Sequence, residues 1–224
     1  MRDERLGGWA LIVGSAMGLV TMAFHPTGAE MLRDFDGRAT TNIAAHALAM
    51  LAVPVAMFGA MALARRLDPG AGLARLALTF YGFGQVAVLL AAIASGLVAT
   101  AMVSDILAGV GAEAESARQL LRYTSTLNHA FATVFVAASS IAIALWSLVM
   151  LGARDFPRWV AWLGLAVGVA LVAITLLGRL RLDVHHFGLV VLAQSVWLVA
   201  SGVCLVRARE GGGPADAEDQ RERP

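Results

Sequence analysis

The stretch Leu76–Val103 reads LALTFYGFGQVAVLLAAIASGLVATAMV and carries no charged side chain along its whole length. A helix needs about 20 predominantly apolar residues to cross ~30 Å of hydrocarbon, and this stretch is longer than that. Lipid offers no hydrogen-bond partner to an open backbone, so an apolar stretch of this kind predicts a transmembrane helix. Its extra length predicts that the helix tilts or projects beyond the bilayer.

Five other neutral runs of similar length accompany this stretch. The six expected spans are residues 6–24, 43–64, 76–103, 130–153, 159–178 and 184–206. Turn-forming segments such as Asp68-Pro69-Gly70 and Asp155-Phe156-Pro157 separate neighbouring runs. We therefore expect an all-α polytopic bundle of six transmembrane helices in three consecutive hairpins, forming one membrane domain over residues 1–206.

Three local features refine this expectation. Pro54 lies inside the second run and predicts a kink there, because proline removes a helical hydrogen bond. The polar segment Ala112–Ser125 is typical of a short surface helix that runs into the fourth span. The tail, residues 207–224, begins with a glycine cluster and continues with alternating charges, a composition that predicts disorder.

Composition excludes several classes of function. Hydrophobic residues make up 58% of the chain and charged residues only 15%, whereas a soluble domain carries about a quarter charged residues. The formal net charge of +1 gives no footprint for nucleic acid. The single cysteine, Cys204, cannot form an internal disulfide or a thiolate metal framework. The expected partner is the lipid bilayer, and a homo-oligomer or a membrane partner subunit stays open.

The arginines indicate an orientation, because cytoplasmic loops of membrane proteins are enriched in positive charge. With the N-terminus inside, more arginines fall on the inner side than on the outer side, and many acidic residues fall outside. Both termini are therefore expected in the cytoplasm. The inner arginines would be Arg2, Arg5, Arg65, Arg66, Arg75, Arg154, Arg158, Arg207 and Arg209.

The histidines form the main functional clue. At a helical rise of 1.5 Å per residue, they fall at similar depths, about 29–37 Å from the arginines at the inner ends of their spans. Imidazole is a common ligand of zinc, copper, nickel and haem iron, and a site between helices needs such residues on several helices. The candidate metal ligands on this outer layer are His25, His46, His129, His185 and His186.

His46 is the strongest single candidate because it lies some way inside its run. His46 and His129 form a possible axial pair for a cofactor such as haem b, and Met50 shares the His46 face as a possible thioether ligand. Thr21, Asn42 and Ser125 each precede a histidine by four residues and are candidate partners of the imidazoles. Haem, copper and zinc all stay open as cofactors.

Two resemblances to known families add context. The segments Trp146–Leu177, which contains Asp155-Phe156-Pro157-Arg158-Trp159, and Gln194–Leu205 together resemble an uncharacterised group of bacterial six-helix membrane proteins, a domain of unknown function. The likeness covers roughly the C-terminal third. It implies six spans in a bacterial cytoplasmic (inner) membrane and no particular activity.

The second resemblance rests on Ser125-x-x-x-His129, which is similar to a local motif of membrane hydrolases that hold zinc with three histidines. The paired H-x-x-x-H of that family is absent, since His185 and His186 are adjacent. The likeness implies a lipid hydrolase, for which Asp183 or Asp105 would have to supply the acid that polarises water.

Three hypotheses follow from the sequence. The leading one is a membrane protein that binds a transition metal or haem at an outer histidine site, in electron transfer or metal handling. The alternatives are a metal-dependent membrane hydrolase acting on lipid and a non-catalytic membrane scaffold or partner subunit. Histidine is also common at membrane interfaces, where its ring tip meets water, so the layer by itself leaves these hypotheses open.

Overall fold

The protein is all-helical in a computed structural model that describes residues 2–26, 28–67, 72–109, 111–180 and 182–207. One segment within the third span is a π-helix, η1, in which the hydrogen bonds skip one more residue than in an α-helix. The elements are α1 (Arg2–Phe24), α2 (Gly28–Arg33), α3 (Phe35–Leu67), α4 (Gly72–Ile93), η1 (Ala94–Val98), α5 (Ala99–Ala108), α6 (Ala112–Gly152), α7 (Arg158–Leu176) and α8 (Val184–Arg207).

Six helical segments of the described chain are long and apolar enough to cross a membrane, which confirms the predicted helical bundle. They are α1, α3, the continuous rod α4–η1–α5, α6, α7 and α8. Each matches one of the six apolar runs of the sequence, although α6 and α7 end one and two residues before their runs do. The protein is therefore a multi-pass membrane protein.

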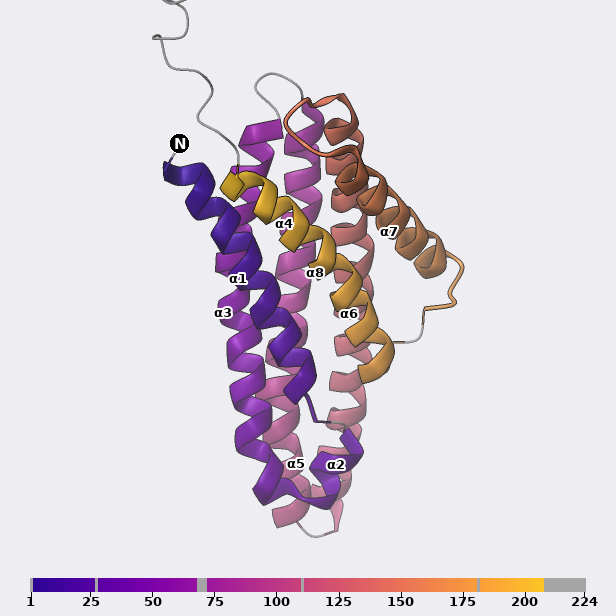
Figure 1. The fold of residues 1–224 in the computed structure, drawn as a ribbon. Helices are drawn as coiled ribbons and strands as arrows, with labels where there is room; N and C mark the ends of the chain where they lie inside the picture. The colour runs from indigo at the N-terminus through magenta and orange to yellow at the C-terminus, as the bar shows by residue number, and fades with distance from the viewer. Residues whose placement is uncertain (1, 27, 68–71, 110, 181, 208–224) are drawn as a thin grey trace, which may run out of the picture.

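The helices pack as two groups that face each other. α1 packs along both α3 and α8, while α4 packs along α6, and α7 covers the other side of α6 (Figure 1). The α3–α4 contact joins the groups on one side. The first two predicted hairpins pack along their length, whereas α7 and α8 lie mainly against α6 and α1. The space between the groups is where a site can form.

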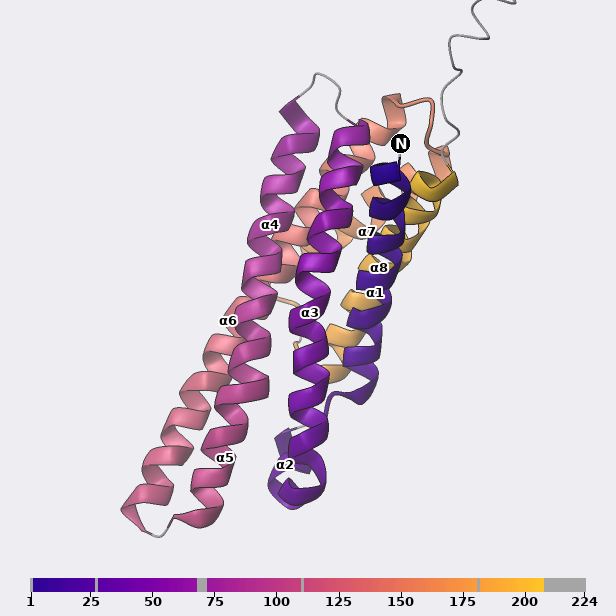
Figure 2. The same ribbon diagram turned by 90° about the vertical axis from the view of Figure 1, so that its left-hand side faces the viewer.

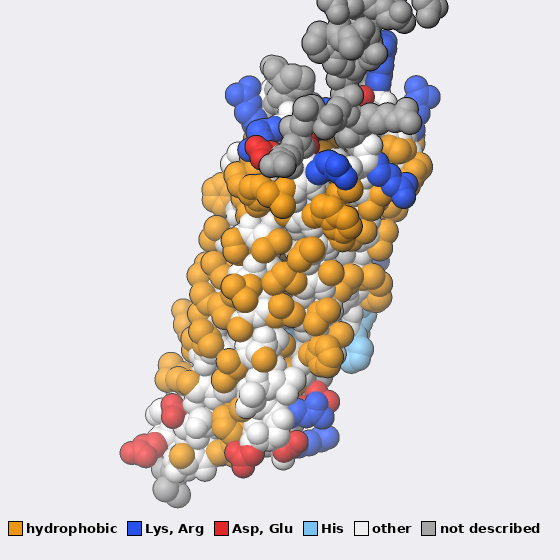
Figure 3. Space-filling view, turned by 60° about the vertical axis from the view of Figure 1, so that its left-hand side comes forward, with side chains coloured by type: hydrophobic (Ala, Val, Ile, Leu, Met, Phe, Trp, Pro, Cys, Tyr) orange, Lys and Arg blue, Asp and Glu red, His pale blue; other side chains and the backbone are white. Residues whose placement is uncertain are grey.

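Charges mark the two ends of the bundle. Arginines gather at the end that holds the starts of α1 and α7 and the end of α8, called here the arginine end. Most acidic residues gather at the opposite end, called here the acidic end, together with some arginines, and an apolar belt lies between the two ends (Figure 3). At the arginine end, Arg66 pairs with Asp155 at 2.6 Å and with Glu4 at 3.6 Å, tying α3 to the α6–α7 connection and to α1.

The helices differ in length, and the excess lies at the acidic end. α6 has 41 residues, about 62 Å of helix and twice the ~30 Å hydrocarbon thickness. Figure 2 shows α5 and the first part of α6 extending past the ends of α1 and α8. The predicted surface helix at Ala112–Ser125 is therefore the beginning of α6, continuous with the span.

The half of the bundle near the arginine end has a dense aromatic core. Trp146 and Trp197 stack with centroids 6.2 Å apart, and Tyr81 lies 5.4 Å from Trp146. The indole N–H groups donate to the backbone carbonyls of Ala74 and Val160, both at 3.1 Å. This half holds most of the buried apolar side chains, while the acidic half has a smaller cluster around Phe135 and Val136.

Some sequence expectations are modified and some fall outside the described residues. α3 continues as a helix through Pro54. Neither α2 nor η1 was expected from the sequence. The predicted Asp68-Pro69-Gly70 turn lies outside the described residues, as does the predicted tail beyond Arg207.

Candidate functional site

A cavity of about 180 Å³ lies between the two helix groups, beginning beside Tyr81 of the aromatic core and extending toward the acidic end. Ser15 and Tyr81 line it near the middle of the bundle, and His25, His46 and His129 line it toward the acidic end. His25 lies ten residues beyond Ser15, so the cavity extends about 15 Å along the bundle, roughly half the hydrocarbon thickness.

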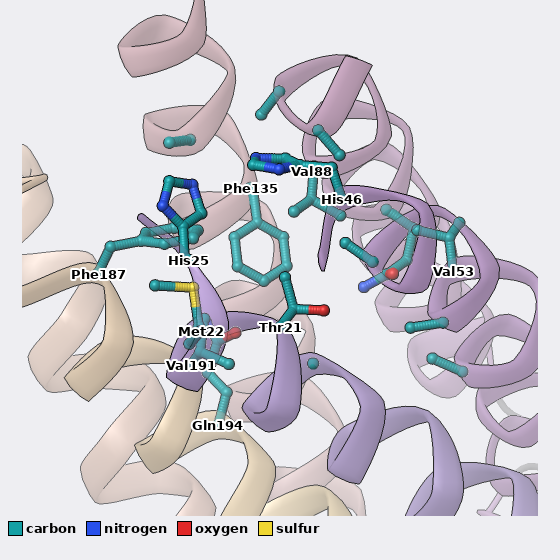
Figure 4. A pocket seen from close by; sticks show the side chains of 18 of the residues that line it. Thr21, Met22, His25, His46, Val53, Val88, Phe135, Phe187, Val191 and Gln194 are labelled. Atoms are coloured by element: carbon teal, nitrogen blue, oxygen red, sulfur yellow. The ribbon is translucent and has the colours of Figure 1, made fainter. Parts of the chain in front are cut away.

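The cavity wall is predominantly apolar. Alanines and larger aliphatic or aromatic side chains form most of it, and no Asp, Glu or Arg belongs to the lining found among the described residues. Figure 4 shows His25 and His46 near each other, with Met22, Val191 and Gln194 further along the wall. A largely apolar chamber with a limited number of polar groups is typical of small-molecule sites in proteins.

His25 and His46 are in direct contact. Their ring centroids are 4.7 Å apart and the planes are inclined by 62°, an edge-to-face arrangement. His25 follows the end of α1, and His46 lies in α3 and is only 3% exposed. Two of the five candidate histidines thus meet although 20 residues separate them in the chain. His129 of α6 also lines the cavity and is exposed.

Each of these three histidines binds a backbone carbonyl through Nδ1. The acceptors are the carbonyls of Pro26, Asn42 and Ser125 for His25, His46 and His129, all at 2.8 Å. A carbonyl oxygen can only accept, so Nδ1 must carry the proton in the neutral ring. Nε2 of all three neutral rings therefore keeps its lone pair for a ligand proton or a metal.

The expected partners act through their backbone. Asn42 and Ser125 hold the imidazoles four residues later with their carbonyls, not with their side chains. The Thr21 hydroxyl donates to the carbonyls of Met17 and Ala45 instead of binding His25. It therefore joins α1 to α3 close to the histidine pair.

The π-helical segment η1 makes room for His46. A Cβ atom placed on Gly96 would overlap the His46 Cβ and would lie 2.6 Å from its Cγ. Only glycine lets η1 and the His46 side chain approach this closely. π-helical turns are frequent at functional sites, where they shift the backbone against a neighbouring helix.

A buried hydrogen-bond network satisfies the carbonyls around η1. The Asn42 amide donates to the Ser95 carbonyl at 3.1 Å and to Thr100 Oγ1 at 2.9 Å. Thr100 Oγ1 in turn donates to the Gly96 carbonyl at 2.7 Å. The Asn42 side chain thus holds η1 while its backbone carbonyl orients His46.

His185 and His186 are exposed and do not belong to the cavity lining. They open α8, where their backbone N–H groups donate to Asp183 Oδ1 at 3.1 and 3.0 Å. His186 Nδ1 also lies 2.6 Å from Asp183 Oδ2. Donation from the His186 backbone, and then from its ring, holds the pKa of Asp183 below its usual value. Asp183 is the N-terminal cap of α8.

The five candidate histidines do not come together as one metal site among the described residues. No three His, Cys, Asp or Glu side chains in the described part of the chain lie close enough together to hold a metal ion. Met50 is half-buried and does not line the cavity, and Asp105 lies on a separate depression beside α5. His25 and His46 are therefore the two protein ligands that the cavity could offer together, with His129 on the same wall.

Haem does not fit between His25 and His46 as they stand. Two axial imidazoles on opposite faces of an iron would have centroids roughly 6 Å apart, given metal–nitrogen distances of ~2 Å. The observed 4.7 Å is nearer to two corners of a tetrahedral site. His46 and His129, the axial pair predicted from the sequence, both line the cavity.

No protein-family model matches this chain, and neither the curated proteins nor the solved structures contain a significant match.

The sequence alone did not reveal the residues of η1 and α5 that surround His46. The residues concerned lie opposite Asn42 and His46 in the fold but 50 to 58 positions away in the chain. They are Ser95, Gly96 and Thr100. The available signal was a Ser-Gly pair inside a long apolar run facing an Asn-x-x-x-His pattern. Without the pairing of α3 with η1, nothing distinguishes that glycine from the other glycines of the spans.

Proposed function

We propose that this protein binds an amphipathic, lipid-like molecule in the cavity between its helix groups, with the polar end at His25 and His46. The observation that carries the proposal is the make-up of the wall: apolar side chains form most of it, and the paired imidazoles of His25 and His46, with free Nε2 atoms, lie at one end, where the exposed His129 also lines the cavity. A ligand that buries a chain and satisfies these nitrogens fits both parts.

The depth of the cavity supports a ligand that comes from the membrane. His46 lies about 29 Å along α3 from Arg65, so the imidazoles are close to the hydrocarbon boundary at the acidic end. The positive-inside rule places the arginine end in the cytoplasm. In the proposed bacterial inner membrane, both termini are cytoplasmic and the histidines meet the outer leaflet, where lipid head groups lie.

A photoreactive amphiphile tests this proposal. The protein is reconstituted in nanodiscs with dodecan-1-ol that carries a diazirine near its methyl end, irradiated, digested and mapped by mass spectrometry. We expect labels on cavity-lining residues of α1, α3 and α8, reduced by excess dodecan-1-ol. Labels confined to lipid-facing side chains, such as Leu176 and Trp162 of α7, would reject the proposal.

A transition metal at the same histidines is a second candidate, favoured by the contact of the His25 and His46 rings and by their free Nε2 atoms. Water or another ligand would have to complete the coordination of zinc or copper. Metal analysis of the purified protein tests it. Metal in a one-to-one ratio, lost in His46→Ala and kept in His186→Ala, would support the site. The absence of metal from a protein purified without chelator, with no Soret band, would reject both metal and haem.

The two other hypotheses predict different results. A lipid hydrolase would need an acid beside the metal, and the described cavity lining holds no carboxylate. Product release from a lipid panel that is lost in His46→Ala would support the hydrolase. A scaffold or partner subunit predicts that substitution of the histidines changes stability alone.

A further inference from the structure

We infer that the molecule bound here has an uncharged hydrogen-bond donor, a hydroxyl group, at its polar end. This inference deepens the proposed amphiphile site and rests on it. Two observations support the inference: the hydrogen-bonding atoms of the cavity that remain without a partner, and the absence of charged side chains from its described wall.

The imidazoles present acceptors to the cavity. Because Nδ1 of His25, His46 and His129 donates to a backbone carbonyl, the remaining Nε2 atom of each neutral ring can only accept. A ligand group placed among these nitrogens must therefore bring its own proton. An ether or a ketone oxygen has none and would leave Nε2 unpaired.

Other polar groups of the wall do not replace the proton that the imidazole Nε2 atoms need from a ligand. The Ser15 hydroxyl, near the middle of the bundle, has no hydrogen-bond partner among the described residues and could itself donate or accept. The Thr21 hydroxyl hydrogen is used by the carbonyls of Met17 and Ala45. Further along the wall, Gln194 Nε2 donates to Ser140 Oγ at 3.0 Å. The amides of Gln85 and Asn128 also line the cavity, and they can both donate and accept, so they do not select between ligands.

The missing charges exclude ionic head groups. No Asp, Glu or Arg lines the described cavity wall, so a bound carboxylate, phosphate or ammonium group would have no counter-ion while the imidazoles are neutral. Burying an unpaired charge in such surroundings is far more costly than burying a hydroxyl group that forms a hydrogen bond. A carboxylate would also face the lone pairs of Nε2. Long-chain alcohols and other hydroxyl-terminated lipids meet all these conditions.

A set of competitors with one chain and different head groups tests the inference. The photoreactive dodecanol labels the wild-type protein in nanodiscs at pH 8, while dodecan-1-ol, its methyl ether, dodecanoate or dodecyltrimethylammonium competes. The methyl ether retains the oxygen and lacks only the donated proton. We expect half-maximal competition by the alcohol at roughly 5-fold lower bilayer concentration than by the ether, the value of one net hydrogen bond. Both ions should compete less well than the alcohol.

The variants His46→Leu and His46→Gln locate the preference. Leucine removes the acceptor and should bring the alcohol and the ether to equal competition. Glutamine keeps an acceptor and should retain part of the preference. The wild-type series alone decides the inference if either variant fails to fold. The hydroxyl inference would be overturned if the alcohol and the ether competed equally in the wild type, or if an ion competed more strongly than the alcohol. In either case, labels on the cavity wall would still support the proposed function. Labels outside the cavity would overturn the proposed function itself.

Discussion

Gly96 in η1 lies against the side chain of His46 in α3, so closely that a Cβ atom on Gly96 would overlap the His46 Cβ and approach its Cγ to 2.6 Å. This contact fixes where the His46 ring enters the cavity. The same ring contacts His25, with ring centroids 4.7 Å apart. His46 therefore contacts both the π-helical turn and His25, and a change in η1 should also move the histidine pair.

Replacing Gly96 with alanine should destabilise the protein and displace His46. The new methyl group meets atoms near the His46 backbone, which cannot rotate away, and overpacking of this kind costs about 1–3 kcal/mol. Thermal unfolding in detergent and photolabelling of the cavity measure the two effects. We expect Gly96→Ala to unfold at lower temperature and to take up less label.

Gly82→Ala is the matched control for Gly96→Ala. It lies in the same rod, and its Cβ would meet only the flexible Met57 Cε at 3.8 Å, an ordinary contact. Alanine also favours a helix by about 1 kcal/mol relative to glycine. Gly82→Ala should therefore be neutral or stabilising. If both variants behaved alike, the close approach of Gly96 to His46 would not be what holds the site.

Removing the Asn42 side chain should disrupt η1. Asn42→Ala takes away the donors to the Ser95 carbonyl and to Thr100, and a buried polar group left without its partner costs about 1–3 kcal/mol. The His46 tautomer should not change, because its partner is the Asn42 backbone carbonyl. Thermal unfolding measures the loss.

Thr126→Ala provides a control for Asn42→Ala. Its exposed hydroxyl donates only to the Arg122 carbonyl of its own helix, at 3.1 Å. We expect its stability to stay within about 0.5 kcal/mol of the wild type, as for most surface changes. A loss in Asn42→Ala no larger than in Thr126→Ala would contradict the role assigned to the buried network.

The sequence predicts the architecture of this protein better than its site. Long neutral runs such as Leu76–Val103 specify transmembrane helices locally, because the bilayer imposes their length. The meeting of His25 with His46 depends on how α1 packs on α3, which no local pattern encodes. The sequence predicts a similar depth for His185 and His186, but depth does not determine the direction of a side chain. In the structure, the backbone N–H groups of both residues donate to Asp183 at the start of α8.

The cap of α8 should respond to pH through Asp183. Its hydrogen bonds to His186 hold its folded pKa below the unfolded value, so the charged carboxylate stabilises α8 above the unfolded pKa. That contribution is lost as the pH falls through the lowered folded pKa. Asp183→Asn should unfold more easily than the wild type at pH 7, and the difference should vanish in strong acid. Thermal unfolding of both proteins between pH 7 and pH 2 measures it. A difference that stays constant would contradict the assigned cap.

Filling the cavity should exclude the ligand without removing a histidine. Ala49 lines the cavity from α3, one helical turn from His46, whereas Ala44 of the same helix is exposed. A tryptophan at position 49 would occupy much of the free volume, and one at position 44 would face the surroundings of the bundle. Native mass spectrometry with added dodecan-1-ol should detect bound alcohol in the wild type and in Ala44→Trp and little in Ala49→Trp. Equal binding by the two variants would place the alcohol elsewhere.

The most direct test of the central claim compares the photolabelled positions in the wild type, Ala44→Trp and Ala49→Trp, all in nanodiscs with the diazirine-bearing dodecanol. If the cavity is the binding site, labels on its α1, α3 and α8 walls should be present in the wild type and Ala44→Trp and should fall severalfold in Ala49→Trp, while lipid-facing labels stay equal in all three. Cavity-wall labels that persist unchanged in a folded Ala49→Trp, or that never rise above the lipid-facing background, would contradict the claim.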